Sequence, residues 1–99
     1  MRYVVIFKAS FQQLDAKYSL IAEQLREKAL NQYNCQQFEV LTEGEHEIAL
    51  SYWLTLSDIQ TWQQDAEHRV AQQLGQSMWY THFSVEICEV LRRYSNQKT

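Results

Sequence analysis

The sequence contains no proline, only two glycines and only two cysteines among its 99 residues. Without proline and with so little glycine, no stretch has the composition of a flexible linker, so we expect one domain over residues 1–99. Cys35 and Cys88 lack the close spacing of a zinc site or a redox pair. We therefore interpret them as buried or half-buried thiols of a reducing compartment.

Long runs of charge or of apolar residues are also missing. The net charge is −3, with both signs scattered along the chain, so there is no basic patch for nucleic acid or for an anionic membrane. No apolar run approaches the ~18 residues of a membrane-spanning helix, and the segment after Met1 lacks the features of a signal peptide. We expect a cytoplasmic protein with neither nucleic acid nor membrane as its partner.

The sequence shows a clear periodicity in the spacing of its apolar residues. Alternating or apolar segments predict strands, and apolar residues spaced three and four apart predict helices. Ser57 and Gln60 form a capping box, which predicts that the second helix begins at Ser57, and Gly75 is expected to end it. The predicted strands are residues 3–11, 35–42, 46–53 and 78–93, and the predicted helices are residues 15–31 and 57–75.

This order of elements predicts an α+β fold, the ferredoxin-like βαββαβ sandwich, with an antiparallel four-stranded sheet and both helices on one face. The strands that hold Cys35 and Cys88 would be its edges, too far apart for a disulfide within one chain, while a bridge between subunits stays open. The first strand is apolar on both sides, so its second side needs a cover. A second copy on that face would give a homodimer, a dimeric α+β barrel.

All three tryptophans surround the second predicted helix. Trp62 shares an apolar stripe with Ile59, which fits either a core anchor or the wall of a pocket. Trp53 and Trp79 fall near the ends of the sheet, where each could line a cavity mouth or lie at the dimer contact. Tyr80 follows Trp79 directly and joins the candidate walls.

His68 is the candidate catalytic group. It follows Trp62 by six residues, about 600° around a straight helix at roughly 100° per residue, which places it on the opposite side. If the helix breaks over residues 65–67 and restarts with Asp65 as an N-cap, His68 can turn inward and act as a general base. The alternatives are a solvent-exposed histidine or one bonded to the last strand.

The other two histidines have structural explanations. His82 alternates with the apolar residues of the last strand, which directs it to the dimer side, and His46 beside the Gly44 turn should be exposed. The histidines have no spacing that ligates a metal, and no serine or cysteine has the context of an activated nucleophile. We expect no metal and no cofactor.

A family resemblance follows from the aromatic and small residues of the second half. The chain resembles the antibiotic biosynthesis monooxygenase (ABM) family of dimeric α+β barrels. The resemblance covers nearly the whole chain and is strongest over residues 47–94, in Glu47 to Trp53, Ser57 to Trp62, Glu67-His68-Arg69, Ala71-Gln72, Gly75, Trp79-Tyr80 and Val90 to Tyr94. It implies a small-molecule pocket between the sheet and its helices, and it favours the broken form of the second helix.

The haem-degrading branch of that family fits poorly. Its pattern has a tryptophan in the second helix, matched by Trp62, and a haem-ligating histidine ten residues later, where this chain has Gln72. Its first strand carries an asparagine, where this chain has Ile6, Phe7 and Lys8. Two of the three elements are therefore missing.

Haem degradation is the third functional hypothesis, and two others are favoured over it. The first is a monooxygenase-like enzyme that can work without a cofactor and binds a phenol or quinol between the sheet and the helices. Its base would be His68, and the walls of its pocket would be Trp53, Trp62, Trp79 and Tyr80. The second is a non-catalytic dimer that binds a small ligand or acts as a scaffold.

Overall fold

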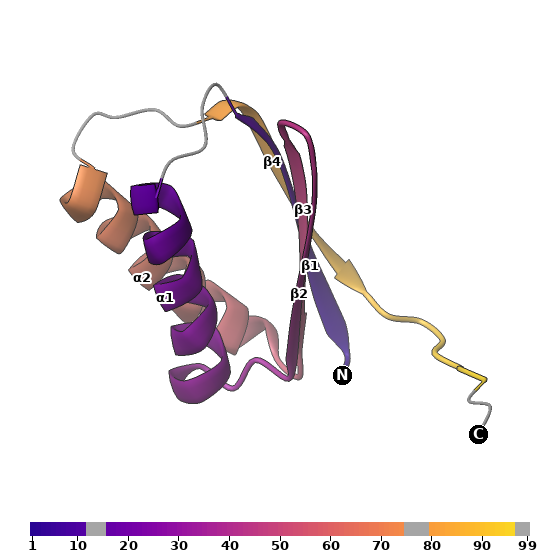
Figure 1. The fold of residues 1–99 in the computed structure, drawn as a ribbon. Helices are drawn as coiled ribbons and strands as arrows, with labels where there is room; N and C mark the ends of the chain where they lie inside the picture. The colour runs from indigo at the N-terminus through magenta and orange to yellow at the C-terminus, as the bar shows by residue number, and fades with distance from the viewer. Residues whose placement is uncertain (12–15, 75–79, 97–99) are drawn as a thin grey trace.

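The computed structural model describes residues 1–11, 16–74 and 80–96, and the side chains within them apart from residues 16–17, 67–74 and 80–81. None of the helices in these ranges combines the length and hydropathy that crossing a membrane requires. The elements are β1 (Tyr3–Phe11), α1 (Ala16–Gln32), β2 (Gln37–Glu43), β3 (His46–Trp53), α2 (Leu56–Leu74) and β4 (Tyr80–Glu89), shown in Figure 1.

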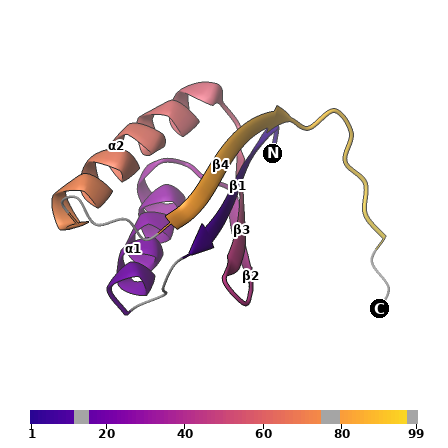
Figure 2. The same ribbon diagram turned by 90° about the horizontal axis from the view of Figure 1, so that it is seen from above.

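The four strands form one antiparallel sheet in the order β2-β3-β1-β4. Both helices lie on one side of this sheet, and the other side carries no helix (Figures 1 and 2). The predicted ferredoxin-like sandwich is therefore confirmed, with β2 and β4 as its edges.

Strand register assigns each side chain to one of two faces. Tyr3, Val5, Phe7, Ala9 and Phe11 of β1 point toward the helices, on what we call the inner face, because Val5, Ala9 and Phe11 are buried in clusters with helix residues. The alternate residues of each strand point to the open face. Its four rows across β2, β3, β1 and β4 are Gln37-Tyr52-Val4-Cys88, Glu39-Leu50-Ile6-Glu86, Leu41-Ile48-Lys8-Ser84 and Glu43-His46-Ser10-His82.

The core lies between the inner face and the helices, in two clusters. One surrounds the end of α1 and the start of α2, and the other surrounds the first turns of α1. The apolar stripe predicted on the first helix supplies both, since its members are buried or half-buried. The clusters are Val5, Ala29, Cys35, Trp53 and Ile59, and Ala9, Phe11, Tyr18 and Ile21.

Tight reversals connect the first elements. Asn34 adopts a left-handed conformation, φ 64°, just after α1, and the Cys35 N–H donates to the carbonyl of Ala29 over 3.0 Å. Gly44, with φ 60°, turns the predicted hairpin between β2 and β3, a conformation that glycine adopts without steric cost.

The start of α2 differs from the prediction. The helix begins at Leu56, and its cap is Thr55 rather than Ser57, since the Thr55 hydroxyl accepts the Asp58 N–H over 3.1 Å. Thr55 and Asp58 occupy the N-cap and N3 positions, the same spacing as Ser57 and Gln60 two residues later.

The last strand is shorter than predicted. Its pairing with β1 ends where β1 begins, at the Tyr3–Glu89 pair, so β4 stops at Glu89 rather than near Arg93. The Val90 N–H still donates to the Arg2 carbonyl over 2.8 Å, and the chain after it projects away from the sheet (Figure 1). Leu91 and Tyr94 in this tail are 90% and 84% exposed.

Candidate functional site

The second helix is continuous through the segment where a break was predicted. α2 runs unbroken over Leu56–Leu74, so Asp65 does not cap a new helix. Its carboxylate instead accepts hydrogen bonds from the Lys28 ammonium over 3.1 Å and from the Tyr33 hydroxyl over 2.9 Å. We call these three residues the Asp65 clamp. It ties α2 to the end of α1, and the predicted break is wrong because Asp65 is engaged in this tertiary contact.

Three of the predicted site residues fall outside the described side chains. His68 lies within the second half of α2, and its imidazole is not described. Trp79 falls outside the described residues altogether. Tyr80 begins β4 and pairs with Phe11 next to a register shift, but its ring is not described. The catalytic and ligand-binding roles of these residues stay predictions.

Trp53 lies at the centre of the core. Its side chain is fully buried, and its indole N–H donates to the Ser51 hydroxyl over 2.9 Å. That bond satisfies two polar groups that would otherwise be buried without partners. Trp53 is therefore a core anchor, which differs from both positions considered for it from the sequence, a cavity mouth and the dimer contact.

Trp62 packs directly on Trp53, with ring centroids 5.4 Å apart, and edge-on against Phe38 at 6.1 Å. Its indole N–H donates to the carbonyl of Leu25 over 3.2 Å. Trp62 thus links α2 to α1 and to β2, and it is half-buried there. The two tryptophans form one aromatic unit on the β2 and β3 side of the molecule.

A different apolar surface lies at the opposite edge of the inner face. Phe83, Val85 and Ile87, which we call the β4 strip, pair with the buried side of β1 and so point to the helix side of the sheet. They nevertheless remain 55%, 42% and 46% exposed. Phe7 stacks on Phe83 with centroids 6.0 Å apart and continues this surface onto β1.

The β4 strip is unusual in its setting. Isolated exposed apolar residues are common, but three large ones along one side of a strand, on the side of a sheet that elsewhere forms the core, make a candidate contact surface. Aromatic and branched aliphatic side chains of this kind line small-molecule sites. The strip therefore offers a flat, apolar contact for an aromatic ligand.

The core contains one thiol with a shifted pKa, that of Cys35. Burial raises the pKa of the Cys35 thiol, although hydrogen bonds with the backbone of Gln37 and Tyr52 act in the opposite direction. A raised pKa makes Cys35 a poor nucleophile, in agreement with the structural role predicted for it. Within the described residues, no three histidine, cysteine or acidic side chains gather as metal ligands would.

The sequence pattern identified Phe83, Val85 and Ile87 as the helix-facing side of the last strand, and the register confirms that assignment. Their exposure was not predicted. The available signal was their size, since the positions beside them on β1 and β3 include small residues such as Ala9, Ala49 and Ser51.

Comparison with known proteins identifies a relative in sequence and solved structures of the same fold. No family model matches the chain. The uncharacterised protein YqjZ of Bacillus subtilis is 30% identical over 92 residues, which cover 92% of this chain and 81% of YqjZ.

Two solved structures share the fold. SnoaB of Streptomyces nogalater, described as a cofactor-independent oxygenase and solved in a mutant form, has a TM-score of 0.73 at 7% identity, covering 96% of this chain and 98% of SnoaB. A Nitrosomonas europaea protein provisionally assigned as an antibiotic biosynthesis monooxygenase has a TM-score of 0.70 at 14% identity, covering 91% and 90%.

Proposed function

The chain belongs to the same family as YqjZ, and we propose that it binds a small phenol or quinol on the β4 strip and oxidises it, a proposal that its shared fold with the oxygenase SnoaB supports. The exposure of Phe83, Val85 and Ile87 on the helix side of the sheet carries this proposal. A planar aromatic ring lying on these side chains would remove both surfaces from water, at roughly 25 cal/mol per Å² of apolar area.

The proposed chemistry needs no cofactor. A deprotonated phenol or quinol is electron-rich enough to reduce dioxygen itself, so that one oxygen atom enters the ring and the other leaves as water, with the substrate supplying all the electrons. The protein then has to exclude water, remove the phenolic proton and stabilise the anion. The β4 strip would supply the apolar contact of such a site, and the bound ring would cover it.

His68 remains the proposed base. Because α2 is continuous, the straight-helix spacing places His68 on the side of the helix opposite Trp62, so the proposed role no longer has the support of a helix break. Imidazole suits the role because it exchanges a proton near neutral pH. Trp79 and Tyr80 remain proposed walls, whereas Trp53 is fully buried and Trp62 packs on it at the β2 and β3 side, away from the β4 strip.

Oxygen uptake with a panel of phenols and quinols tests the activity. We expect the wild type to consume oxygen with at least one substrate and Val85→Glu to lose most of that activity, because a carboxylate on the strip repels an apolar ring and its anion. Leu20→Glu is the matched control, since Leu20 is an exposed residue of α1. Equal rates for Val85→Glu and Leu20→Glu would remove the strip from the proposal.

The base is tested separately with His68→Ala. A loss of oxygen uptake with retained ligand binding supports its role, while unchanged uptake shows that another group, or the substrate's own ionisation, suffices. Ligand binding by the wild type without any oxygen uptake would favour the non-catalytic alternative, a dimer that binds a small aromatic molecule.

We further propose that the open face is covered by a second copy of the chain. Apolar residues occupy most of its first three rows, and Leu41 and Ile48 among them are exposed, which is costly for a face of this size. The tail of residues 90–96, which carries the exposed Leu91 and Tyr94, runs on the side of the sheet away from the helices (Figure 1). A homodimer would bury both groups.

The oligomeric state follows from light scattering coupled to gel filtration. Leu41→Glu should lower the mass from that of a dimer to that of a monomer, because Leu41 is 69% exposed within one subunit and would be buried only in the dimer. Leu20→Glu again serves as control. A monomeric wild type would refute the proposed dimer without affecting the β4 strip.

A further inference from the structure

The tail of residues 90–96 leaves the end of β4 with its large apolar side chains in solvent. Leu91 is 90% exposed and Tyr94 is 84% exposed. Figures 1 and 2 show the tail running away from the sheet and from both helices. Large apolar side chains that contact so little of their own subunit indicate a contact with another molecule.

The root of the tail is held against its own subunit. The Val90 N–H donates to the Arg2 carbonyl over 2.8 Å. The Arg93 guanidinium lies over the Tyr52 ring, 5.5 Å from its centre, on the open face of β3. These contacts fix the direction in which the tail departs but leave its two large apolar side chains uncovered.

The hairpin of β2 and β3 carries an exposed apolar pair on the open face. Leu41 and Ile48 are partners across the two strands and are 69% and 40% exposed. β2 is an edge of the sheet, and its residues 39–43 are all exposed. Half of the backbone groups of an edge strand face away from its neighbour, so β2 can accept a further segment through its backbone as well as its side chains.

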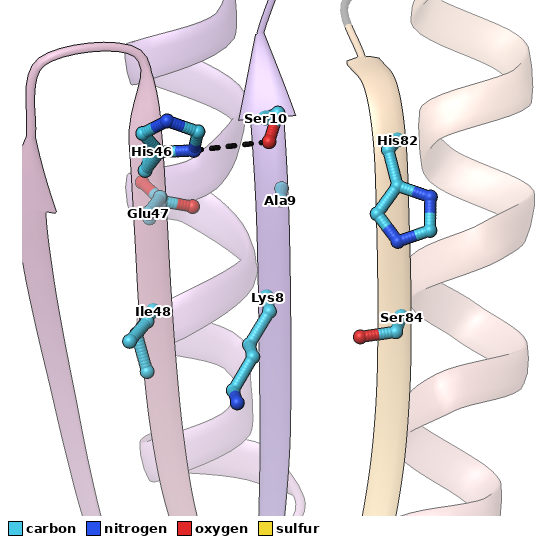
Figure 3. A pocket seen from close by; sticks show the side chains of 8 residues that line it. All are labelled: Lys8, Ala9, Ser10, His46, Glu47, Ile48, His82 and Ser84. Atoms are coloured by element: carbon cyan, nitrogen blue, oxygen red, sulfur yellow. Dashed lines mark hydrogen bonds between the residues drawn. The ribbon is translucent and has the colours of Figure 1, made fainter.

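The hairpin and the tail have opposite charges. Residues 37–46 of the hairpin include three acidic side chains and no lysine or arginine: Glu39, Glu43 and Glu45. The tail has Arg92 and Arg93 and no acidic residue. Lys8 of β1 adjoins Ile48, and both line one hollow of the open face (Figure 3), so the acidic side of the apolar pair is the β2 edge. Complementary charges of this kind select a partner and its orientation.

We propose that the tail of each subunit docks on the β2–β3 hairpin of a second copy of the chain. Leu91 and Tyr94 cover the apolar pair, and Arg92 faces the acidic side chains of β2. The contact occurs twice, because a two-fold axis makes each subunit both donor and acceptor of a tail. This inference rests on the proposed homodimer, and it assigns the segments that hold that dimer together.

The dimensions of the sheet allow this contact. An extended chain of the seven residues 90–96 spans up to roughly 23 Å, and the two edges of a four-stranded sheet are about 14 Å apart. A two-fold axis parallel to the strands reverses the strand order of the second sheet, so the end of β4 in one subunit meets β2 of the other. This arrangement favours the β2 edge over the β4 edge as the docking site.

Two variants with reversed charges test the proposal on the full chain. One is Arg92→Glu, and the other combines Glu39→Lys with Glu43→Lys. Each variant alone places like charges at both contacts, so its dimer dissociation constant should rise about tenfold or more at low ionic strength. In an equimolar mixture both contacts of the heterodimer join opposite charges, so the heterodimer should form with nearly the dissociation constant of the wild type. Analytical ultracentrifugation measures the constants, and native mass spectrometry measures the heterodimer fraction.

The mixture distinguishes docking between subunits from docking within one subunit. A heterodimer fraction no higher than random pairing gives would overturn the proposal. Glu86→Lys, on the open face of β4, is the control, and its mixture with Arg92→Glu should show no enrichment of heterodimer. Enrichment there would place the tail on β4 and overturn the assignment to β2. Unchanged dissociation constants in all variants would overturn the docking and leave the homodimer intact, whereas a monomeric wild type would refute both.

The apolar part of the contact is tested in the same assay. Leu91→Asn should raise the dissociation constant of the dimer severalfold, because the side chain is buried only when the tail is docked. Leu20→Asn is the matched control, since Leu20 is exposed on α1. Equal dissociation constants for these two variants would overturn the contact assigned to Leu91.

Discussion

Two parts of the same inner face differ in how much of their side chains is exposed to solvent. In one row of the sheet, Ser51 on β3 and Val5 on β1 are 3% and 4% exposed, whereas Ile87 beside them on β4 is 46% exposed. Both parts show the alternation of a half-buried strand, so the pattern alone does not distinguish them. The difference lies in which strands the helices cover.

Contacts of the helices account for this difference. The start of α2 is held over β3 by the contact of Ile59 with Trp53, and the Asp65 clamp binds its middle to α1. Covered strands use small residues such as Ala9 and Ala49, which let the helices approach closely, whereas β4 presents large ones. A large apolar residue without a cover is suited to contact a ligand, as proposed for the β4 strip.

Substitution of Trp53 should have the largest effect. Trp53→Ala removes a fully buried indole and leaves the buried Ser51 hydroxyl without its donor, so we expect a loss of about 3–5 kcal/mol in the free energy of unfolding. Urea denaturation measures it, and Trp53→Phe provides a milder variant if the alanine form does not fold.

The matched change on the uncovered side is Ile87→Ala. Since nearly half of this side chain is already in water, we expect a loss below about 1 kcal/mol. Similar losses at the two positions would mean that β4 belongs to the core in solution, and the contrast between the two parts of the inner face would then collapse.

Loss of the Asp65 clamp should have an effect between these two. Asp65→Asn weakens bonds to both Lys28 and Tyr33, and because the ion pair is about one-fifth exposed we expect a loss of about 1–2 kcal/mol in urea denaturation. Glu23→Gln on the exposed side of α1 is the control. A stability equal to that of Glu23→Gln would show that the clamp does not fix the position of α2.

Local patterns predicted the fold well because each element carries its own signal. The hairpin turn at Gly44 and the strand that begins at His46 are set by neighbouring residues, and the structure confirms them. The start of α2 was displaced because Thr55 and Ser57 offer the same capping spacing, and the structure uses the Thr55 hydroxyl.

Longer-range contacts explain the other errors. The break predicted near Asp65 ignored Lys28 and Tyr33, which are more than thirty residues away in sequence and engage the carboxylate. The end of β4 depends on where β1 begins, since a strand without a partner loses its ladder. For the candidate site, alternation placed Phe83 on the helix side, but its exposure depends on the packing of α2, which periodicity does not encode.

The smallest expected effect concerns Cys35, a residue of the covered core. Burial raises the pKa of its thiol in the native state, so the stability tied to the neutral thiol is complete below the ordinary pKa of about 8.5 and declines as the pH rises above it. Urea denaturation at about pH 7 and pH 9.5 should therefore show an alkaline loss in the wild type that is smaller in Cys35→Val. Cys88→Val, on the uncovered strand, should retain the loss of the wild type, and the opposite ranking of the two variants would place the protected thiol on β4 instead of in the covered core.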